Sequence, residues 1–379
     1  MLKQIINFFQ NTKEIISAPE VLGMDISDFS IEVVSLTGSI NRNIQLVAVG
    51  NKVLEPGIIR NGKVLKKEVL KKILKDLIQN PVFGKINSKR FVFSVPTINC
   101  FIYVFEVSKN LNKKEQSDFI IANAGQVFPF SLKELYFDFL PRERNGKKEA
   151  LLAASPKNII DDYLEIFKDL KVKPLVITIE PESLFKSLVE SVKKDEAVLV
   201  VDIGAKVTNF SIFDKIGLKA SFSNDVAGNR FTKRLSEKLN ISQEKAENFK
   251  KRIGLNPDVK EGKIFLILQK EIQTIILEIK KVKNYFQKKE GRKIEKIILT
   301  GGSSKLPGLK KYLEENLKEE ILIGNPWSKM NFKDSSGKKY FEQVLKKESL
   351  CYSTAIGSAL IGLEKSEKNR INFAKKIKD

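Results

Sequence analysis

Two stretches of this chain share one alternation of apolar and polar positions. Residues 21–36 read VLGMDISDFSIEVVSL, and residues 198–213 read VLVVDIGAKVTNFSIF. In each stretch a β-branched apolar run ends at an aspartate, and a short polar turn and a second alternating run follow. Such runs, bounded by turn residues, predict β-strands. We therefore expect a β-hairpin in each half, with a third strand at residues 43–49 and 217–223.

The matched positions of the two stretches predict two related lobes. Superposing Val21 on Val198 puts Asp25 on Asp202 and Ser27 on Gly204. A repeat at this spacing suggests a duplicated lobe rather than a solenoid. Two such hairpins that face each other could hold a polyphosphate through turn N–H groups, with the aspartates orienting a hydrated Mg²⁺. For either stretch alone, an ordinary strand end is the commoner alternative, and the match at paired positions is what favours a site.

A third motif lies late in the chain. A strand-like run at residues 294–300 leads into Gly301-Gly302-Ser303-Ser304, and a helical pattern follows over residues 309–317. Strand, double glycine and helix is the geometry in which backbone approaches a ligand closely at a helix start. A plain loop between a strand and a helix is the alternative.

Composition limits the chemistry that these motifs could carry. A chain of 379 residues is long for one core. It has no histidine, which excludes histidine triads and histidine-ligated zinc, and its two cysteines, Cys100 and Cys351, form no cluster. No apolar run suggests a membrane span and no signal peptide begins the chain, so a cytoplasmic location is expected.

The net charge of +21 raises the question of an anionic partner. The lysines are scattered in short runs without a recognition helix or an aromatic platform, so nucleic acid is not expected. An anionic membrane surface or an acidic partner stays open. The apolar stripe of Leu2, Ile5, Ile6 and Phe9 could contact a membrane or a partner, or could dock on its own lobe.

Together the three motifs resemble the actin-like ATPase superfamily. Two more stretches agree with it: Ala227-Gly228-Asn229 before a helix, and residues 246–250, which resemble the family's AE-x-x-K helix. The resemblance implies ATP or ADP as cofactor, with Mg²⁺ held through water by Asp25 and Asp202. It implies these nucleotide-binding residues: Asp25, Ser27, Asp202, Gly204, Thr208, Gly228, Glu247, Lys250, Gly301, Gly302 and Ser303.

Within that superfamily, in the FtsA and PilM group, the chain is most similar to the type IV pilus assembly family PilM. The similarity rests on the turn at residues 56–62, Pro129-Phe130, residues 179–181 and 325–327, and the small-residue helix at 352–363. It implies a cytoplasmic scaffold at the inner face of the cytoplasmic membrane. Its implied partners are the N-terminal cytoplasmic segment of the inner-membrane protein PilN, pilus motor components and other copies of itself.

The fold class expected is α/β, with an actin-like (ribonuclease-H-like) two-lobed fold, a nucleotide cleft and an inserted strand-helix-strand-strand (SHS2-like) subdomain. We expect the first lobe core at 21–97 and 157–194, with the helix at 348–366 packed on it. The insertion covers 98–156, and with the adjoining lobe it should form a groove for an extended peptide. The second lobe core covers 195–224 and 293–347, and its helical subdomain covers 225–292. There, apolar positions from Phe265 to Phe286 predict a long helix that packs inside the lobe or forms a coiled-coil seam.

Departures from the family pattern predict weak nucleotide binding and very slow hydrolysis. Ser27 replaces a glycine that should allow unusual backbone angles and close approach of N–H groups, Glu32 replaces a lysine, and Lys206 replaces a small residue. A carboxylate ~4 Å from a phosphate charge would cost up to roughly 4 kcal/mol. An active ATPase or kinase and an FtsA-like division protein stay as alternatives, although no catalytic base can be identified.

Overall fold

The computed structural model divides the chain into two compact units. Unit 1 comprises Met1–Ser187 and Pro326–Asp379, and unit 2 comprises Leu188–Asn325. The structure describes residues 19–39, 43–108, 110–144, 146–189, 196–332, 335–340, 342, 346–364 and 370–377. The apolar stripe of Leu2 to Phe9 lies outside these residues. Of the helices in this part of the chain, none is long and apolar enough to cross a membrane.

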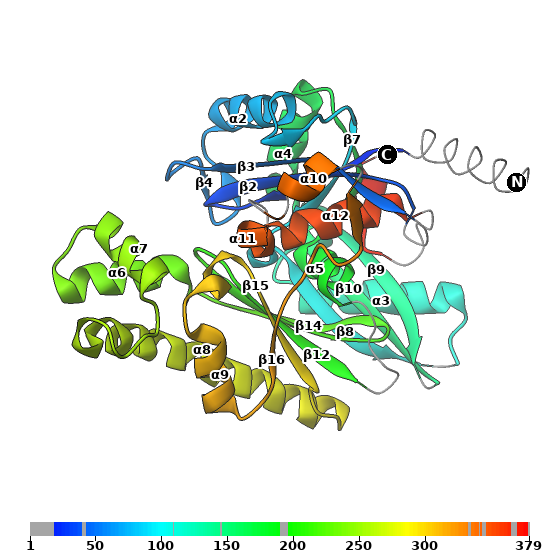
Figure 1. Ribbon diagram of the computed structural model, residues 1–379. Coiled ribbons are helices and arrows are strands. Elements are labelled where there is room, and N and C mark those ends of the chain that lie inside the picture. Colours follow the sequence, from blue (N-terminus) through cyan, green and yellow to red (C-terminus); the bar gives the residue numbers. More distant parts are fainter. Residues whose placement is uncertain are drawn as a thin grey trace, which may run out of the picture. The chain divides into compact units, whose positions relative to one another are not determined.

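Unit 1 is built on a sheet whose strands run in the order β11-β7-β1-β2-β3-β17, with β6 also paired to β3 (Figure 1). The strands are β1 Val21–Ile26, β2 Ser30–Thr37, β3 Ile44–Val53, β6 Phe83–Gly84, β7 Arg90–Val95, β11 Lys173–Ile179 and β17 Met330–Phe332. β1, β2 and β3 form an antiparallel meander, and β7 and β11 extend the sheet in parallel from β1. A small hairpin, β4 Ile59–Arg60 with β5 Lys63–Val64, stands apart from this sheet.

Unit 2 repeats this strand order. Its sheet runs β14-β13-β12-β15-β16, formed by β12 Ala197–Ile203, β13 Thr208–Asp214, β14 Gly217–Asn224, β15 Lys296–Thr300 and β16 Ile321–Ile323. The registers match as well: Asp25 lies opposite Glu32 and beside Ser94, and Asp202 lies opposite Asn209 and beside Thr300. The internal repeat predicted from the sequence is therefore confirmed strand by strand.

Small residues let helix α12, Ser353–Leu363, lie directly on the sheet of unit 1. A Cβ on Gly23 of β1 would come 2.0 Å from Ala355 O, so strand and helix backbones touch. A Cβ on Gly357 would come 1.8 Å from Ser183 O in α5, Glu180–Leu188. Between these elements the buried hydroxyls of Ser94, Ser183 and Ser358 bond to one another at 2.6–3.1 Å.

The rest of the unit 1 core uses large side chains. α2, Lys67–Gln79, buries Leu70, Leu74 and Leu77, and a Cβ on Gly50 of β3 would meet Leu77 at 2.8 Å. From α4, Lys157–Asp169, Phe167 packs on Phe91 with ring centroids 4.3 Å apart. Short helices α10 Ser335–Tyr340 and α11 Lys346–Glu348 precede α12.

The inserted subdomain consists of β8 Phe101–Val107, α3 Lys113–Val127, β9 Leu135–Arg144 and β10 Lys147–Pro156. This is the strand-helix-strand-strand order expected from the sequence, and the strands pair in the order β8-β10-β9. Asn112 starts α3 in a capping box with Glu115, which satisfies N–H groups that the first helical turn leaves over.

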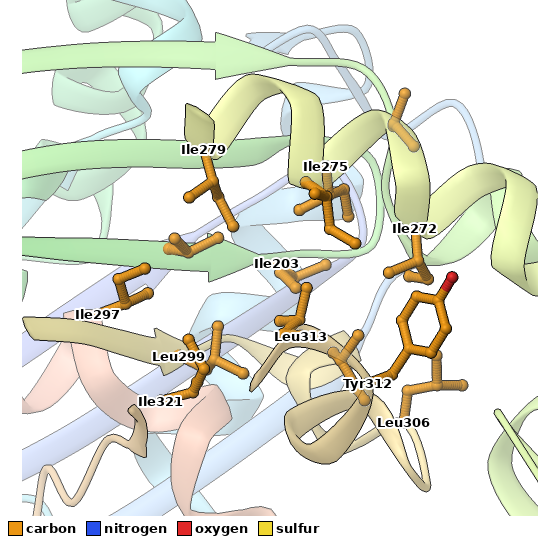
Figure 2. Packing of buried hydrophobic residues seen from close by; sticks show 14 of the residues in the cluster. Ile203, Ile272, Ile275, Ile279, Ile297, Leu299, Leu306, Tyr312, Leu313 and Ile321 are labelled. Atoms are coloured by element: carbon orange, nitrogen blue, oxygen red, sulfur yellow. The ribbon is translucent and has the colours of Figure 1, made fainter. Parts of the chain in front are cut away.

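Helices α6 Gly228–Leu239, α7 Gln243–Arg252, α8 Lys263–Glu290 and α9 Leu309–Leu317 complete unit 2. The apolar stripe of α8, including Ile272, Ile275 and Ile279, packs against sheet residues such as Ile203 and Leu299 (Figure 2). The long helix is therefore a packing element of its own unit, which was one of the two expectations, and its stripe is no exposed coiled-coil seam.

Two features near the end of the chain add to the sequence expectations, and the first of them corrects a boundary. The second lobe was expected to extend to residue 347, but the structure assigns Pro326 onward to unit 1, where β17 pairs in parallel with β3. A three-residue strand has too little periodicity to be assigned from sequence. The second feature is the segment at residues 370–377, in which Ile371 and Phe373 are 0% exposed. It contains the 3₁₀ turn η7, Phe373–Lys376, and contacts β11 and β9.

Candidate functional site

Three loops of unit 2 converge beyond the end of β12. The turn after Asp202 offers Gly204 O, which accepts hydrogen bonds from Gly228 N at 3.1 Å and from Ser303 Oγ at 2.8 Å. Asn229 N donates to Ala205 O at 2.7 Å. The first turn of α6 and the loop after β15 are thus both fixed to the turn of the β12–β13 hairpin, so three of the sequence motifs lie at one place.

Two glycines make this convergence possible. Gly301 has a φ of +82°, and a Cβ there would come 2.2 Å from Asp202 Oδ1. A Cβ on Gly228 would come 2.2 Å from Ser303 Oγ. Gly301 therefore satisfies a conformational and a steric requirement at once, because L-residues rarely adopt this φ. Gly302 follows as the first residue of a 3₁₀ turn, η4 Gly302–Lys305.

Glu247 and Lys250 of α7 form a charged pair beside Gly228. Lys250 Nζ lies 2.6 Å from Glu247 Oε2 and donates to Gly228 O at 3.1 Å. Thr232 Oγ1 donates to the same Glu247 oxygen at 2.5 Å. Desolvation raises the pKa of Glu247, but the Lys250 ammonium and the Thr232 hydroxyl outweigh it and hold that pKa below its usual value. Burial lowers the pKa of Lys250, which the Glu247 carboxylate partly opposes.

Two hydroxyls contribute differently from what the sequence suggested. Thr208, expected to contact the cofactor, is 0% exposed and donates to Val226 O at 2.7 Å, which holds the loop that leads into α6. Thr232, which was not predicted, joins the Glu247–Lys250 pair to α6. The sequence could have indicated Thr232, because it lies one helical turn after Gly228 and therefore on the same face of the helix.

The corresponding turn in unit 1 is closed by a side chain. Ser27 N donates to Ser30 O at 2.9 Å, as Gly204 N donates to Val207 O at 3.0 Å in unit 2. In addition, Ser27 Oγ accepts from Phe29 N at 3.2 Å and from Ser30 N at 3.0 Å. The hydroxyl thus already accepts hydrogen bonds from the N–H groups that a turn of this kind would direct at a phosphate.

The backbone of this turn differs from the sequence expectation. Glycine was expected to be needed there for unusual backbone angles, and that expectation is wrong, because neither Ser27 nor Gly204 has a positive φ. A Cβ on Gly204 would instead come 2.9 Å from the backbone oxygen of Val207, so the turn itself would have to move to hold a side chain there. Both turns keep the same N–H···O hydrogen bond, and serine adds a hydroxyl to the turn of unit 1.

Asp25 and Glu32 lie directly across from each other on β1 and β2. Glu32 is buried, and desolvation raises its pKa from 4.5 to about 8, against a hydrogen bond to Ser30 that lowers it. Glu32 is therefore mainly protonated at pH 7. The full like-charge repulsion expected between this carboxylate and a phosphate does not apply while the side chain carries its proton.

The part of the chain that the structure describes contains no group of three or more His, Cys, Asp or Glu side chains that could hold a metal ion. Asp25 and Asp202 each lie near the end of the first strand of their own sheet. A Mg²⁺ ion bound through water by these two residues stays a prediction.

The insertion offers two different borders. β8 has one described sheet neighbour, β10, and carries aromatic residues, of which Tyr103 is 39% exposed. β9 lies at the other border, and two of its charged residues have partners. Asp138 Oδ2 accepts from Asn372 N at 2.9 Å, and Arg142 pairs with buried Glu149 at 2.8 Å.

Solved structures place this architecture among known folds. The "PilM-PilN type IV pilus biogenesis complex" is similar with a TM-score of 0.75 and 22% identity, over 91% of this chain and 98% of that one. The "ethanolamine utilization protein EutJ from Carboxydothermus hydrogenoformans" is similar with a TM-score of 0.54 and 14% identity, over 90% of this chain and 89% of that one. The repeated sheets and these similarities define an actin-like fold.

A family model described as "Type IV pilus assembly protein PilM" matches residues 23–363. The match covers most of the chain. The chain therefore belongs to the PilM family.

Proposed function

We propose that this chain is a cytoplasmic scaffold of type IV pilus assembly that binds the N-terminal cytoplasmic segment of a PilN-like inner-membrane protein. The observation that carries the proposal is the family match over residues 23–363. The similar PilM structure, in a complex with PilN, supports it. On this proposal the chain works at the inner face of the cytoplasmic membrane through its partner.

The partner's segment binds unit 1 where β9 of the insertion meets β11 and α5. Side chains there can accept main-chain N–H groups: Asp138 on β9 and Glu182 on α5 each accept one already, at 2.9 Å. Extended peptides are commonly held through such backbone contacts, with apolar side chains giving specificity. The insertion supplies one side of this place and the core supplies the other.

A titration with a fluorescent N-terminal segment of the PilN-like protein tests this assignment. All proteins compared carry Ile371→Ser and Phe373→Ser, because Asp138 also binds Asn372 N of this chain and a change at Asp138 would otherwise alter that contact as well. Asp138→Lys places a cation where N–H groups must be accepted, so it should weaken binding at least tenfold. Asp118→Lys makes the same charge change at an exposed position of α3 and should leave binding unchanged. Tyr103→Glu probes the β8 border. If it abolishes binding while Asp138→Lys does not, the segment binds along β8 and the location is wrong.

Unit 2 of this scaffold binds ATP or ADP, with weak or no hydrolysis. Support comes from the close approach of Gly228 and Gly301 to their neighbours and from the Glu247–Lys250 pair beside Gly228. Mg²⁺ would be held through water by Asp25 and Asp202. A kinase needs a base positioned at its substrate hydroxyl, and the sequence motifs identify none. Phosphate release near the enzyme median of ~10 per second would contradict the scaffold assignment.

A further inference from the structure

The segment at residues 370–377 packs on unit 1 as a peptide ligand would. Its backbone is extended at Asn372, with φ −147° and ψ 97°. In an extended chain, residues on either side of Asn372 point the same way, and these two, Ile371 and Phe373, are fully buried. The segment contacts β11 of the core and β9 of the insertion, and it therefore bridges the two.

Polar contacts hold the segment through both its backbone and its side chains. Ile371 N donates to Glu182 Oε2 and Asn372 N donates to Asp138 Oδ2, each at 2.9 Å. The Asn372 side chain accepts from Ile177 N of β11 at 3.1 Å. Two successive N–H groups of the segment are therefore bound by carboxylates from two different parts of unit 1.

Cationic side chains fix the two ends of the segment. Arg370 Nη1 donates to Ile361 O at the end of α12, at 2.6 Å. Lys375 Nζ lies 3.2 Å from Asp138 Oδ2, the oxygen that also accepts from Asn372 N. The place therefore fits a peptide that is extended at an asparagine between two apolar residues, turns after the asparagine, and carries a cation on each side of it. We call it the 370–377 seat, formed by Ile177, Glu182, Asp138 and Ile361.

We propose that residues 370–377 are a tethered, exchangeable occupant of the seat that the partner's segment uses, so that the partner must displace them. This inference rests on the proposed function, because it identifies the 370–377 seat with the partner site at β9, β11 and α5. The partner's segment should then share the chemistry of the occupant. The chain regulates its own partner binding by competition.

Tethering sets the size of the effect. A segment on a short linker has an effective concentration on the order of 1 mM at its site. If its intrinsic Kd is ~1 µM, the seat is open about one-thousandth of the time, and an external peptide binds about a thousandfold more weakly than it would to an empty seat.

The direct test uses a fluorescent synthetic peptide of residues 370–377 as the probe. A chain that ends at Glu364 should bind it, and the full chain should bind it at least a hundredfold more weakly. Asp138→Lys in the shortened chain should abolish binding, and Asp118→Lys should not. A folded shortened chain that does not bind the probe would overturn the proposal.

A second variant covers the case in which the shortened chain fails to fold. Ile371→Ser with Phe373→Ser in the full chain removes the two apolar anchors and keeps the polypeptide length. This variant should bind the probe where the wild type does not. Circular dichroism checks the fold, and a folded variant that excludes the probe would contradict an exchangeable occupant.

Competition separates this proposal from the proposed function. The PilN-like segment should displace the probe from the shortened chain and should bind that chain more tightly than the full chain. If it binds both chains equally and leaves the probe in place, the occupant proposal is wrong and partner binding stands at another site. If it binds neither chain, the proposed function fails and the occupant proposal fails with it.

Discussion

The two hairpins of this protein have the same register but different turns. In unit 1 the Ser27 hydroxyl accepts from Phe29 N and Ser30 N, which closes the turn on itself. In unit 2 the equivalent residue is Gly204, which has no hydroxyl, and its carbonyl instead binds Gly228 and Ser303 of two other loops. The two hairpins thus share their strand pairing and differ at one side chain. With serine the turn bonds to itself, and with glycine the turn binds two other loops.

A second difference between the hairpins concerns the residue that pairs with the aspartate of the first strand. Opposite Asp25 is Glu32, a buried carboxyl whose pKa desolvation raises to about 8. Opposite Asp202 is Asn209, a neutral amide that accepts from Ser223 Oγ at 2.7 Å. Unit 1 therefore carries a proton-dependent carboxyl where unit 2 carries a fixed dipole, so the two hairpins should respond differently to pH.

Replacing the ionisable carboxyl of Glu32 should have the largest effect on the free energy of unfolding, and this effect depends on pH. The pKa of Glu32 is about 8 in the folded state, against 4.5 for the same side chain in water. The folded state therefore binds this proton more tightly, and the stability that it contributes is lost as the pH rises from 4.5 to about 8. The loss is up to roughly 5 kcal/mol.

Glu32→Gln gives both hairpins an amide and should remove this part of the pH dependence. Urea unfolding of wild type and variant at about pH 5 and about pH 9, on either side of this range, measures it. The free energy of unfolding of the variant should increase relative to that of the wild type as the pH rises. Equal pH dependence of the two proteins would show that Glu32 does not titrate as described.

Gly301→Ala should have the next largest effect, on stability. It combines strain at φ +82° with a Cβ 2.2 Å from Asp202 Oδ1, so we expect a loss of about 3 kcal/mol. Gly291→Ala is the matched control, because its φ is +67° but nothing lies within 4 Å of a Cβ there. It should lose only ~1–2 kcal/mol. Equal losses in thermal or urea unfolding would mean that the carboxylate does not restrict this glycine.

Asp202→Ala should abolish the nucleotide-dependent rise in thermal stability. With ATP and Mg²⁺ at about a hundred times Kd, that rise corresponds to about 2.7 kcal/mol in the wild type. Asp25→Ala should reduce it less, because the turn of unit 1 already uses its N–H groups internally. An undiminished shift in Asp202→Ala, measured by thermal denaturation with and without nucleotide, would mean that the site is misplaced.

Restoring the family residues in the first hairpin should have the smallest effect. Ser27→Gly with Glu32→Lys removes the hydroxyl that occupies Phe29 N and Ser30 N and adds positive charge. ATP affinity should rise at least tenfold, about 1.4 kcal/mol. Calorimetric titration of both proteins measures the change, and an unaltered Kd would show that the first hairpin does not limit nucleotide binding.

Sequence alone indicated much of this structure, for reasons that individual elements make clear. The hairpins, β15 and α8 have strong apolar periodicity and were placed correctly, and the strand-helix-strand-strand order of the insertion was also predicted. Local patterns could not indicate β17, which is defined by its pairing with β3. The docking of residues 370–377 was not predicted either, because its partners, Glu182 and Asp138, are distant in sequence.

Some features of the candidate site could likewise be predicted from the sequence, and others could not. Residue types and their order suggested Gly301 and Ser303, because glycine and a small polar residue beside a helix start are typical of a close backbone approach. Gly228 followed from the family resemblance. The protonation of Glu32 depends on burial by the folded chain and could not be derived from its neighbours in sequence.

The central claim is that unit 1 binds the partner and unit 2 binds the nucleotide. The most direct measurement is the affinity of the labelled PilN-like segment for the chain with Ile371→Ser and Phe373→Ser, in which residues 370–377 no longer compete through Asp138. The account predicts that adding Asp138→Lys to this chain weakens binding at least tenfold and that adding Asp202→Ala leaves binding unchanged. Loss of binding in Asp202→Ala with full binding in Asp138→Lys would contradict it.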